Sequence, residues 1–168
     1  MRRKSQVCQK QPLSSPVVTI FDEQNDLEFS HEGVRHIVKV VLSHYEIDTD
    51  EVILNFVDTK SICSLHKEYF DDPTVTDCIT FPIDGTDSIS TPSVMGEIFI
   101  CPETGIKHDP ENPHTELALY VIHGLLHLIG YDDLTEEDRK LMREQERKCL
   151  ILLEKEKVVL TNSQALYI

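Results

Sequence analysis

The stretch from Leu117 to Ile129 constrains the fold more than any other part of the sequence, because the helix that it predicts is apolar on nearly every face. Asn112 is placed as its N-cap and Pro113 at its first helical position, while Gly130 is placed to end it in a left-handed turn. A helix without a polar face needs cover on all sides. We therefore expect it at the centre of the fold.

Strands and further helices are expected to supply that cover. Four short stretches have the β-branched and apolar character of strands, at residues 17–21, 51–57, 77–81 and 96–101. Three more helices are expected to begin after Ser30, Asp58 and Thr135. The helix after Asp58 should bury Ile62, Leu65 and Tyr69. The order β-α-β-α-β-β-α-α predicts an α+β fold, in which a mixed four-stranded sheet is packed with helices.

The length and composition favour one domain. A chain of 168 residues that is 40% hydrophobic can bury a core without disulfides. We expect a flexible N-terminal arm at 1–16, a single domain at 17–157 and a C-terminal tail at 158–168. The five cysteines include no C-x-x-C pair, which excludes a zinc ribbon and a disulfide framework. No signal-peptide core or membrane-length apolar run is present, so the expected location is the cytoplasm.

The charge balance limits the partners. The chain has 16 Lys and Arg against 30 Asp and Glu, a formal net charge of −14. This field repels polyanions, so we expect neither a membrane nor DNA as a partner, and weak binding of free RNA. Net charge does not forbid a local site at which a divalent ion receives a phosphate. We expect a basic partner protein to deliver such a substrate.

Two histidines in the apolar helix form the candidate chemical site. His123 and His127 are four residues apart, which places both imidazoles on one face about 6 Å apart along the axis. After Gly130 the chain can return so that Asp133 offers a carboxylate to the same ion, and Asp132 is the rival for that role. We assign Asp132 instead as an acceptor that orients a ligand. Two imidazoles and one carboxylate leave a coordination position open, as catalytic zinc requires.

The spacing H-x3-H-x2-G-x2-D parallels that of the metzincin proteases and predicts a zincin-like, metal-bearing helix. Those enzymes place a general-base Glu directly after the first His, where this chain has Gly124. Loss of such a base typically costs about 10²–10⁴ in rate, which disfavours a peptidase. Phosphodiester cleavage depends less on a dedicated base, because a metal can neutralise the phosphate and activate water.

Other polar residues are interpreted as solvated surface. The remaining histidines considered are His31, His36, His44, His108 and His114, and of these His114 could reach the site. The charge run from Glu136 to Lys148 contains acid–base pairs four residues apart and predicts an exposed helix face.

Residues 123–133, HGLLHLIGYDD, resemble the H-G-x-L-H-L-x-G-Y-D-H signature of the YbeY family of rRNA maturation endoribonucleases. Residues 76–82, TDCITFP, are similar to the family's T-D-V-L-S-F-P segment, and residues 95–98, MGEI, to its L-G-D-I strand. The resemblance spans about residues 17–153. It implies one Zn²⁺ per chain, or another divalent ion, on His123, His127 and Asp133. It also implies cleavage of single-stranded RNA in 16S rRNA 3′-end maturation and ribosome quality control, with rRNA, the 30S and 70S ribosome and ribosomal proteins as partners.

Two positions depart from the family pattern. The third ligand is His in most members, and Asp133 adds a negative charge that should weaken the metal as a Lewis acid and admit oxygen-preferring ions such as manganese. Members also tend to carry an Arg after a Tyr upstream of T-D-V-L-S-F-P, whereas Tyr69 is followed here by Phe70. Either another cation, for which Lys67 is the candidate, replaces that Arg, or its role is not filled in this chain.

Three functions therefore compete. The first is a metal-dependent endoribonuclease, with His123, His127 and Asp133 acting through the metal. The second is a non-catalytic ribosome-assembly factor in which the metal holds the turn at Gly130. The third and least favoured is a small metallopeptidase. The sequence leaves the general base, the native metal, the RNA cleavage site and the oligomeric state open.

Overall fold

The computed structural model describes residues 15–83 and 93–161. The expected N-terminal arm at 1–16 and tail at 158–168 lie largely outside the described residues, so these domain boundaries stay predictions. Within the described ranges, no helix combines the length and apolar character that crossing a membrane requires. All four cysteines in these ranges are free thiols.

The centre of the fold is the four-stranded mixed sheet that the sequence predicts. Its strands are β1 (Val17–Asp22), β2 (Glu51–Phe56), β3 (Cys78–Pro82) and β4 (Val94–Ile100). Their order is β1-β2-β4-β3, with β1, β2 and β4 parallel and β3 antiparallel to β4. The strands at 77–81 and 96–101 are therefore neighbours, as expected, and β3 forms one edge of the sheet.

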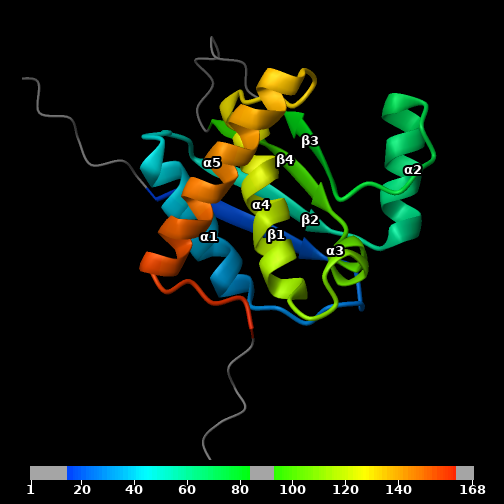
Figure 1. The fold of residues 1–168 in the computed structure, drawn as a ribbon, viewed down its shortest axis with the longest axis horizontal. Coiled ribbons are helices and arrows are strands. Elements are labelled where there is room, and N and C mark those ends of the chain that lie inside the picture. The colour runs from blue at the N-terminus through cyan, green and yellow to red at the C-terminus, as the bar shows by residue number, and fades with distance from the viewer. Residues whose placement is uncertain (1–14, 84–92, 162–168) are drawn as a thin grey trace, which may run out of the picture.

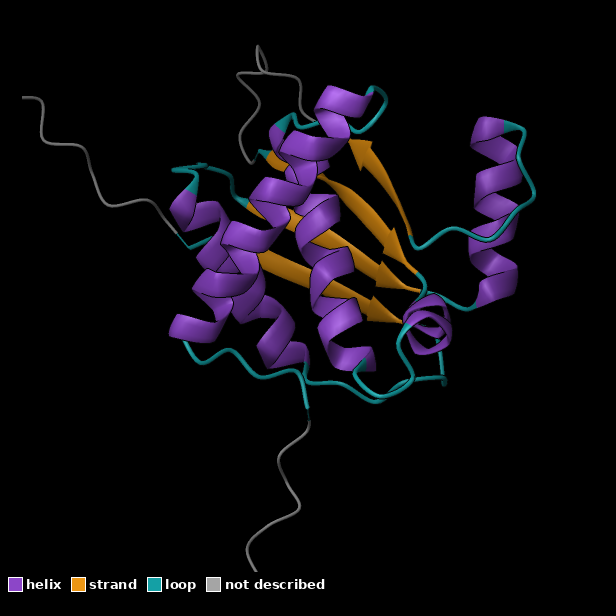
Figure 2. Ribbon diagram, in the orientation of Figure 1, coloured by secondary structure: helices purple, strands orange, loops and turns teal. Residues whose placement is uncertain are grey.

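Three helices cover one face of this sheet, as Figures 1 and 2 show. They are α1 (His31–His44), α4 (Pro113–Ile129) and α5 (Glu136–Lys155). Their ends follow the predicted capping residues: the Ser30 and Thr135 side chains accept backbone N–H groups, and Gly130 has φ 116°. Asn112 precedes α4 but makes no side-chain cap bond, because its amide binds the Asp109 carboxylate instead.

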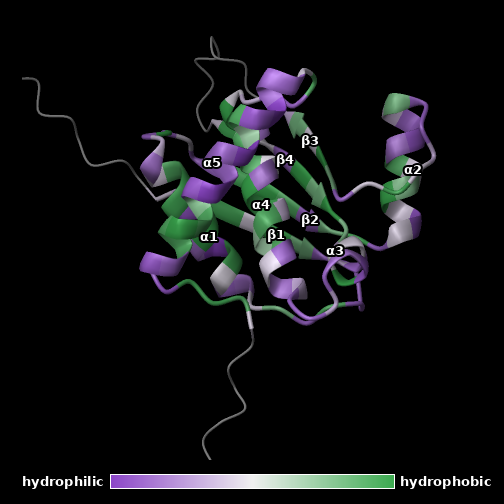
Figure 3. Cartoon of the chain, viewed as in Figure 1, coloured by the Kyte–Doolittle hydropathy of each residue, from purple (hydrophilic) through white to green (hydrophobic). Residues whose placement is uncertain are grey.

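The core lies between the sheet and these helices. Alternate residues of β2 are fully buried and face the apolar stripe of α1 and the body of α4; they are Val52, Leu54 and Phe56. Eight of the 17 residues of α4 are buried, all within 117–126, which confirms the expected central helix, and Figure 3 shows green along its middle. Each large side chain buried here contributes about 1.5–3 kcal/mol.

A short helix, α3 (Pro102–His108), was not predicted. Its N-cap residue, Cys101, makes no side-chain cap bond, and the segment has no apolar stripe that would indicate a helix. Packing holds it in place, because a Cβ atom at Gly105 would lie 3.1 Å from the Glu116 Cβ and 3.4 Å from the Tyr120 ring of α4.

Helix α2 (Thr59–Phe70) begins after Asp58, as expected, but buries less than predicted. Ile62 is buried and Leu65 is half-buried, whereas Tyr69 is 57% exposed. The prediction for Tyr69 was wrong because α2 contacts the sheet only at its edge, near β3, and beyond its first turn, which is hydrogen-bonded to α3, it lies apart from the other helices (Figure 1). The exposed C-terminal turn of α2 becomes important for the site.

Candidate metal centre

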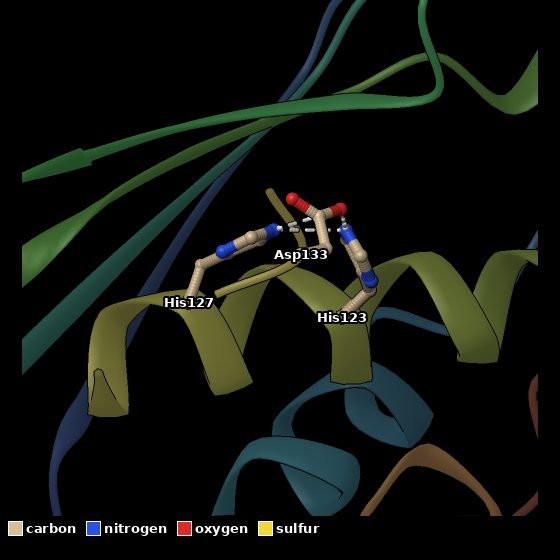
Figure 4. A group of neighbouring side chains, drawn as sticks. All are labelled: His123, His127 and Asp133. Atoms are coloured by element: carbon tan, nitrogen blue, oxygen red, sulfur yellow. Dashed lines mark hydrogen bonds and ion pairs between the residues drawn. The ribbon is translucent and has the colours of Figure 1, made fainter. Parts of the chain in front are cut away.

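The structure brings together the three candidate ligands that the sequence predicts. His123 and His127 project from the same face of α4, and the Asp133 carboxylate lies over both imidazoles (Figure 4). Asp133 Oδ2 is 3.6 Å from His123 Nε2 and 3.7 Å from His127 Nε2. The two Nε2 atoms are 2.9 Å apart. All three side chains are half-buried.

Gly130 makes this convergence possible. Its positive φ, which residues with a side chain rarely adopt, turns the chain sharply at the end of α4. Its N–H donates to the carbonyls of Leu126 and His127. Asp132 Oδ1 accepts the backbone N–H of Asp133 at 2.8 Å, and Arg139 donates to the Asp133 carbonyl at 3.2 Å. The turn is thus held from both sides, and the carboxylate of Asp133 is directed at the histidines.

Acceptors at both Nδ1 atoms decide where the imidazole protons lie. His123 Nδ1 donates to Glu146 Oε1 at 2.6 Å, and His127 Nδ1 donates to the Tyr131 carbonyl at 3.0 Å. Because these oxygens only accept, the neutral imidazoles carry their protons on Nδ1 and keep lone pairs on Nε2. Asp132, expected to orient a ligand, contacts the backbone of Asp133 and neither imidazole.

The donor set fits a divalent ion. Two Nε2 lone pairs and a carboxylate oxygen point at one place, and they repel each other unless a cation lies among them. At a Zn–N distance of about 2.0–2.1 Å, tetrahedral ligands stand roughly 3.3 Å apart. The three separations of 2.9, 3.6 and 3.7 Å lie within a few tenths of an ångström of that value.

Glu146 is the supporting residue that the sequence analysis missed. It lies in the charge run interpreted as an exposed helix face, and two pairs of that run are indeed exposed, Lys140 with Glu136 and Lys148 with Glu144. The side chain of Glu146, however, is only 15% exposed. Its position beside the buried stripe of α5 was the available signal, because it stands four residues after the buried Met142.

Charge around His123 raises the pKa of its imidazole in the metal-free protein. Burial alone lowers the pKa of His123, but the bond to Glu146 and the negative charges of Glu146, Asp77 and Asp133 outweigh burial and raise the pKa above its ordinary value. A site that attracts a proton to a cluster of lone pairs is also one that attracts a metal cation.

Gly124, the position at which metalloproteases carry the general-base Glu, is packed directly on the sheet. A Cβ atom there would lie 2.6 Å from Ile98 Cγ2 of β4. A side chain at this position requires the Ile98 side chain or α4 itself to move. The helix is therefore held against the sheet at the same point where a peptidase would need its base.

A cleft of about 330 Å³ opens beside the three candidate ligands. Its walls are α4, the chain entering β3, and the last turns of α2, from which His66 and Phe70 contribute. Asp77 and Cys78 also line it, and burial raises the pKa of the Cys78 thiol. Among the described residues that line this cleft there is no Lys or Arg.

Two expectations about nearby cations were wrong. Lys67 does not line the cleft, whereas its neighbour His66, which was not among the predicted site residues, does. His114 does not reach the site, because its Nε2 binds the Glu28 carbonyl at 2.8 Å.

Comparisons with known proteins identify the family of the chain. The sequence model of the family described as Endoribonuclease YbeY matches residues 19–154. An Endoribonuclease YbeY of Protochlamydia amoebophila is 45% identical over 142 residues, which are 83% of this chain and 94% of that protein. One of Chlamydia caviae is 39% identical over 151 residues, covering 86% and 96%. The solution structure of TM1509 from Thermotoga maritima is 24% identical, with a TM-score of 0.56 over 84% of this chain and 91% of that one, and it supports the fold alone.

Proposed function

The chain belongs to the Endoribonuclease YbeY family, and from that membership we propose that it is a metal-dependent endoribonuclease that cleaves single-stranded RNA. The observation that carries the proposal is the convergence of His123 Nε2, His127 Nε2 and Asp133 Oδ2 at the wall of an open cleft. In this proposal the helix α4 is a zincin-like, metal-bearing helix.

Zinc is the ion that we propose, at one per chain. Two imidazole nitrogens and a carboxylate oxygen suit Zn²⁺ and leave a position open, while the carboxylate of Asp133 also suits manganese. A divalent ion held there supplies Lewis acidity to a phosphodiester and makes water more acidic. The chain's own contribution is orientation: Glu146 and the Tyr131 carbonyl hold the Nδ1 protons, so that both Nε2 lone pairs face the cleft.

The biological role that we propose is maturation of the 16S rRNA 3′ end and ribosome quality control. The partners would be rRNA, the 30S and 70S ribosome and ribosomal proteins, and the location the cytoplasm. The net charge of −14 supports delivery by a basic ribosomal protein, because an acidic surface gains little from binding free RNA.

The experiment compares zinc-loaded wild type with His127→Ala on a labelled single-stranded RNA. Cleavage should fall to background in the variant, because one of the three ligands is removed. His108→Ala is the matched control, since His108 is exposed on α3 and does not line the cleft. It should cleave as wild type does.

The outcomes separate the competing functions. Intact RNA after incubation with folded, metal-loaded wild type would refute the proposal. If wild type left the RNA intact, and His127→Ala kept its ribosome association but was less thermally stable, a non-catalytic assembly factor with a structural metal would be the better explanation. A peptidase is disfavoured by the contact of Gly124 with Ile98, which leaves no space for a carboxylate base unless Ile98 or α4 moves.

A further inference from the structure

An exposed aromatic ring stands at the wall of the cleft that holds the candidate ligands. Phe70, at the end of α2, is 57% exposed and lines the cleft together with Asp133 and both histidines of α4. Exposure of a large apolar side chain to water is energetically unfavourable. This side chain is next to the site at which the RNA phosphate is proposed to bind. What distinguishes Phe70 among the exposed apolar side chains is its position in this cleft, where its ring offers a flat apolar surface to a ligand.

His66 holds this ring from the preceding turn of α2. The two rings have centroids 5.5 Å apart and an interplanar angle of 51°. His66 Nδ1 donates to the Thr74 carbonyl at 2.9 Å, which fixes the imidazole and thereby one side of Phe70. More than half of the Phe70 surface remains exposed beside this contact.

The charges of the cleft exclude the usual way of holding a nucleic acid. Its described lining contains the acidic Asp77 and Asp133 and no Lys or Arg, on a chain with a net charge of −14. Phosphate contacts away from a metal would therefore be repulsive. Stacking on an aromatic face is neutral, and it accepts any base that is free of a partner strand.

The geometry points to Phe70, supported by His66, as a stacking platform for one unpaired nucleobase of the RNA strand whose phosphate lies at the metal centre. This inference rests on the proposed function and adds a specificity determinant to it. A base in a duplex is already stacked and paired, so it cannot leave its helix to cover Phe70 without an energetic cost. The platform therefore selects single strands.

The test is a double-mutant cycle between Phe70 and the RNA. The cleavage site in a short single-stranded RNA is first mapped with zinc-loaded wild type, and abasic nucleotides are then placed one at a time around it. In wild type, one abasic position should raise KM roughly 5- to 150-fold, with a smaller effect on kcat. Phe70→Ala should raise KM on the intact RNA by a similar factor, and the abasic position should then cause no further loss.

Two variants control for structure. Phe70→Tyr keeps an aromatic face and should restore KM to near the wild-type value. Tyr69→Ala removes a residue that is as exposed as Phe70, and its ring centroid lies 4.7 Å from that of Phe81. Because Tyr69 does not line the cleft, the KM of this variant should not change. Metal content, measured by elemental analysis, should be one ion per chain in every variant.

Several results would overturn the inference while leaving the endoribonuclease proposal intact. The first is a Phe70→Ala enzyme with wild-type KM. The second is that Phe70→Ala and every abasic substitution raise KM additively. The third is that Tyr69→Ala raises KM as much as Phe70→Ala does. A variant that kept wild-type KM on RNA but lost ribosome association would show that Phe70 binds a protein instead. If wild type cleaved no RNA at all, the proposed function and this inference would fail together.

Discussion

Removing the carboxylate of Glu146 should weaken metal binding without touching a ligand. Glu146 accepts the Nδ1 proton of His123 at 2.6 Å, and the two side chains are 15% and 18% exposed. With Glu146→Ala, the imidazole loses both its orientation and the charge that makes Nε2 more basic. Loss of such a partner typically costs 10- to 100-fold in metal affinity, equivalent to about 1.4–2.7 kcal/mol.

The assay is a competition titration of zinc against a chromophoric chelator. Glu144→Ala is the matched control, because Glu144 is on the same helix, is 49% exposed and pairs only with Lys148. It should bind zinc with wild-type affinity. Glu146→Gln should lie between wild type and Glu146→Ala, since the amide oxygen can still accept the proton. Wild-type affinity in Glu146→Ala would refute the argument that this bond prepares His123 for the metal.

The pH dependence of this difference has a defined sign. Metal binding needs neutral His123, and in wild type the pKa of His123 is raised by Glu146, so zinc affinity should fall as the pH drops through that raised pKa. Glu146→Ala removes the hydrogen bond and the charge of Glu146 that raise the pKa of His123, so competition from protons begins at lower pH than in wild type. The zinc dissociation constant of Glu146→Ala divided by that of wild type should therefore decrease as the pH falls. A ratio that increased as the pH fell would contradict the conclusion that Glu146 raises the pKa of His123.

Three further changes test other parts of the structure. Gly124→Ala should destabilise the fold by about 1–3 kcal/mol in urea unfolding, because the new methyl group meets Ile98, and a second change, Ile98→Ala, should cost less in that background than in wild type. Asp133→His should bind zinc in preference to manganese more strongly than wild type does, as competition between the two ions would show. Thr135→Ala should lower the free energy of unfolding by about 1 kcal/mol, since it removes the capping bond to Asp138 N, and an unchanged midpoint would contradict this.

Local patterns in the sequence predicted most of the elements correctly. The apolar helix, its stop at Gly130 and the cap at Thr135 depend on residues close in the chain, so they could be read in advance. The candidate ligands could be predicted for the same reason, because His123, His127 and Asp133 lie within one helix end and its turn. Tyr69 was placed wrongly because the helical spacing of α2 does not reveal how little of the helix the sheet covers.

What the sequence determined by itself is therefore what short-range chemistry decides: the helix that cannot face water, the glycine that ends it and the three donors around that turn. Only the tertiary structure decided what surrounds them. It brought Glu146 from α5 to His123, packed Gly124 on Ile98 and set Phe70 opposite the candidate ligands. These contacts join residues that are far apart in the chain, and their distances follow from how helices pack on the sheet, which no local pattern encodes.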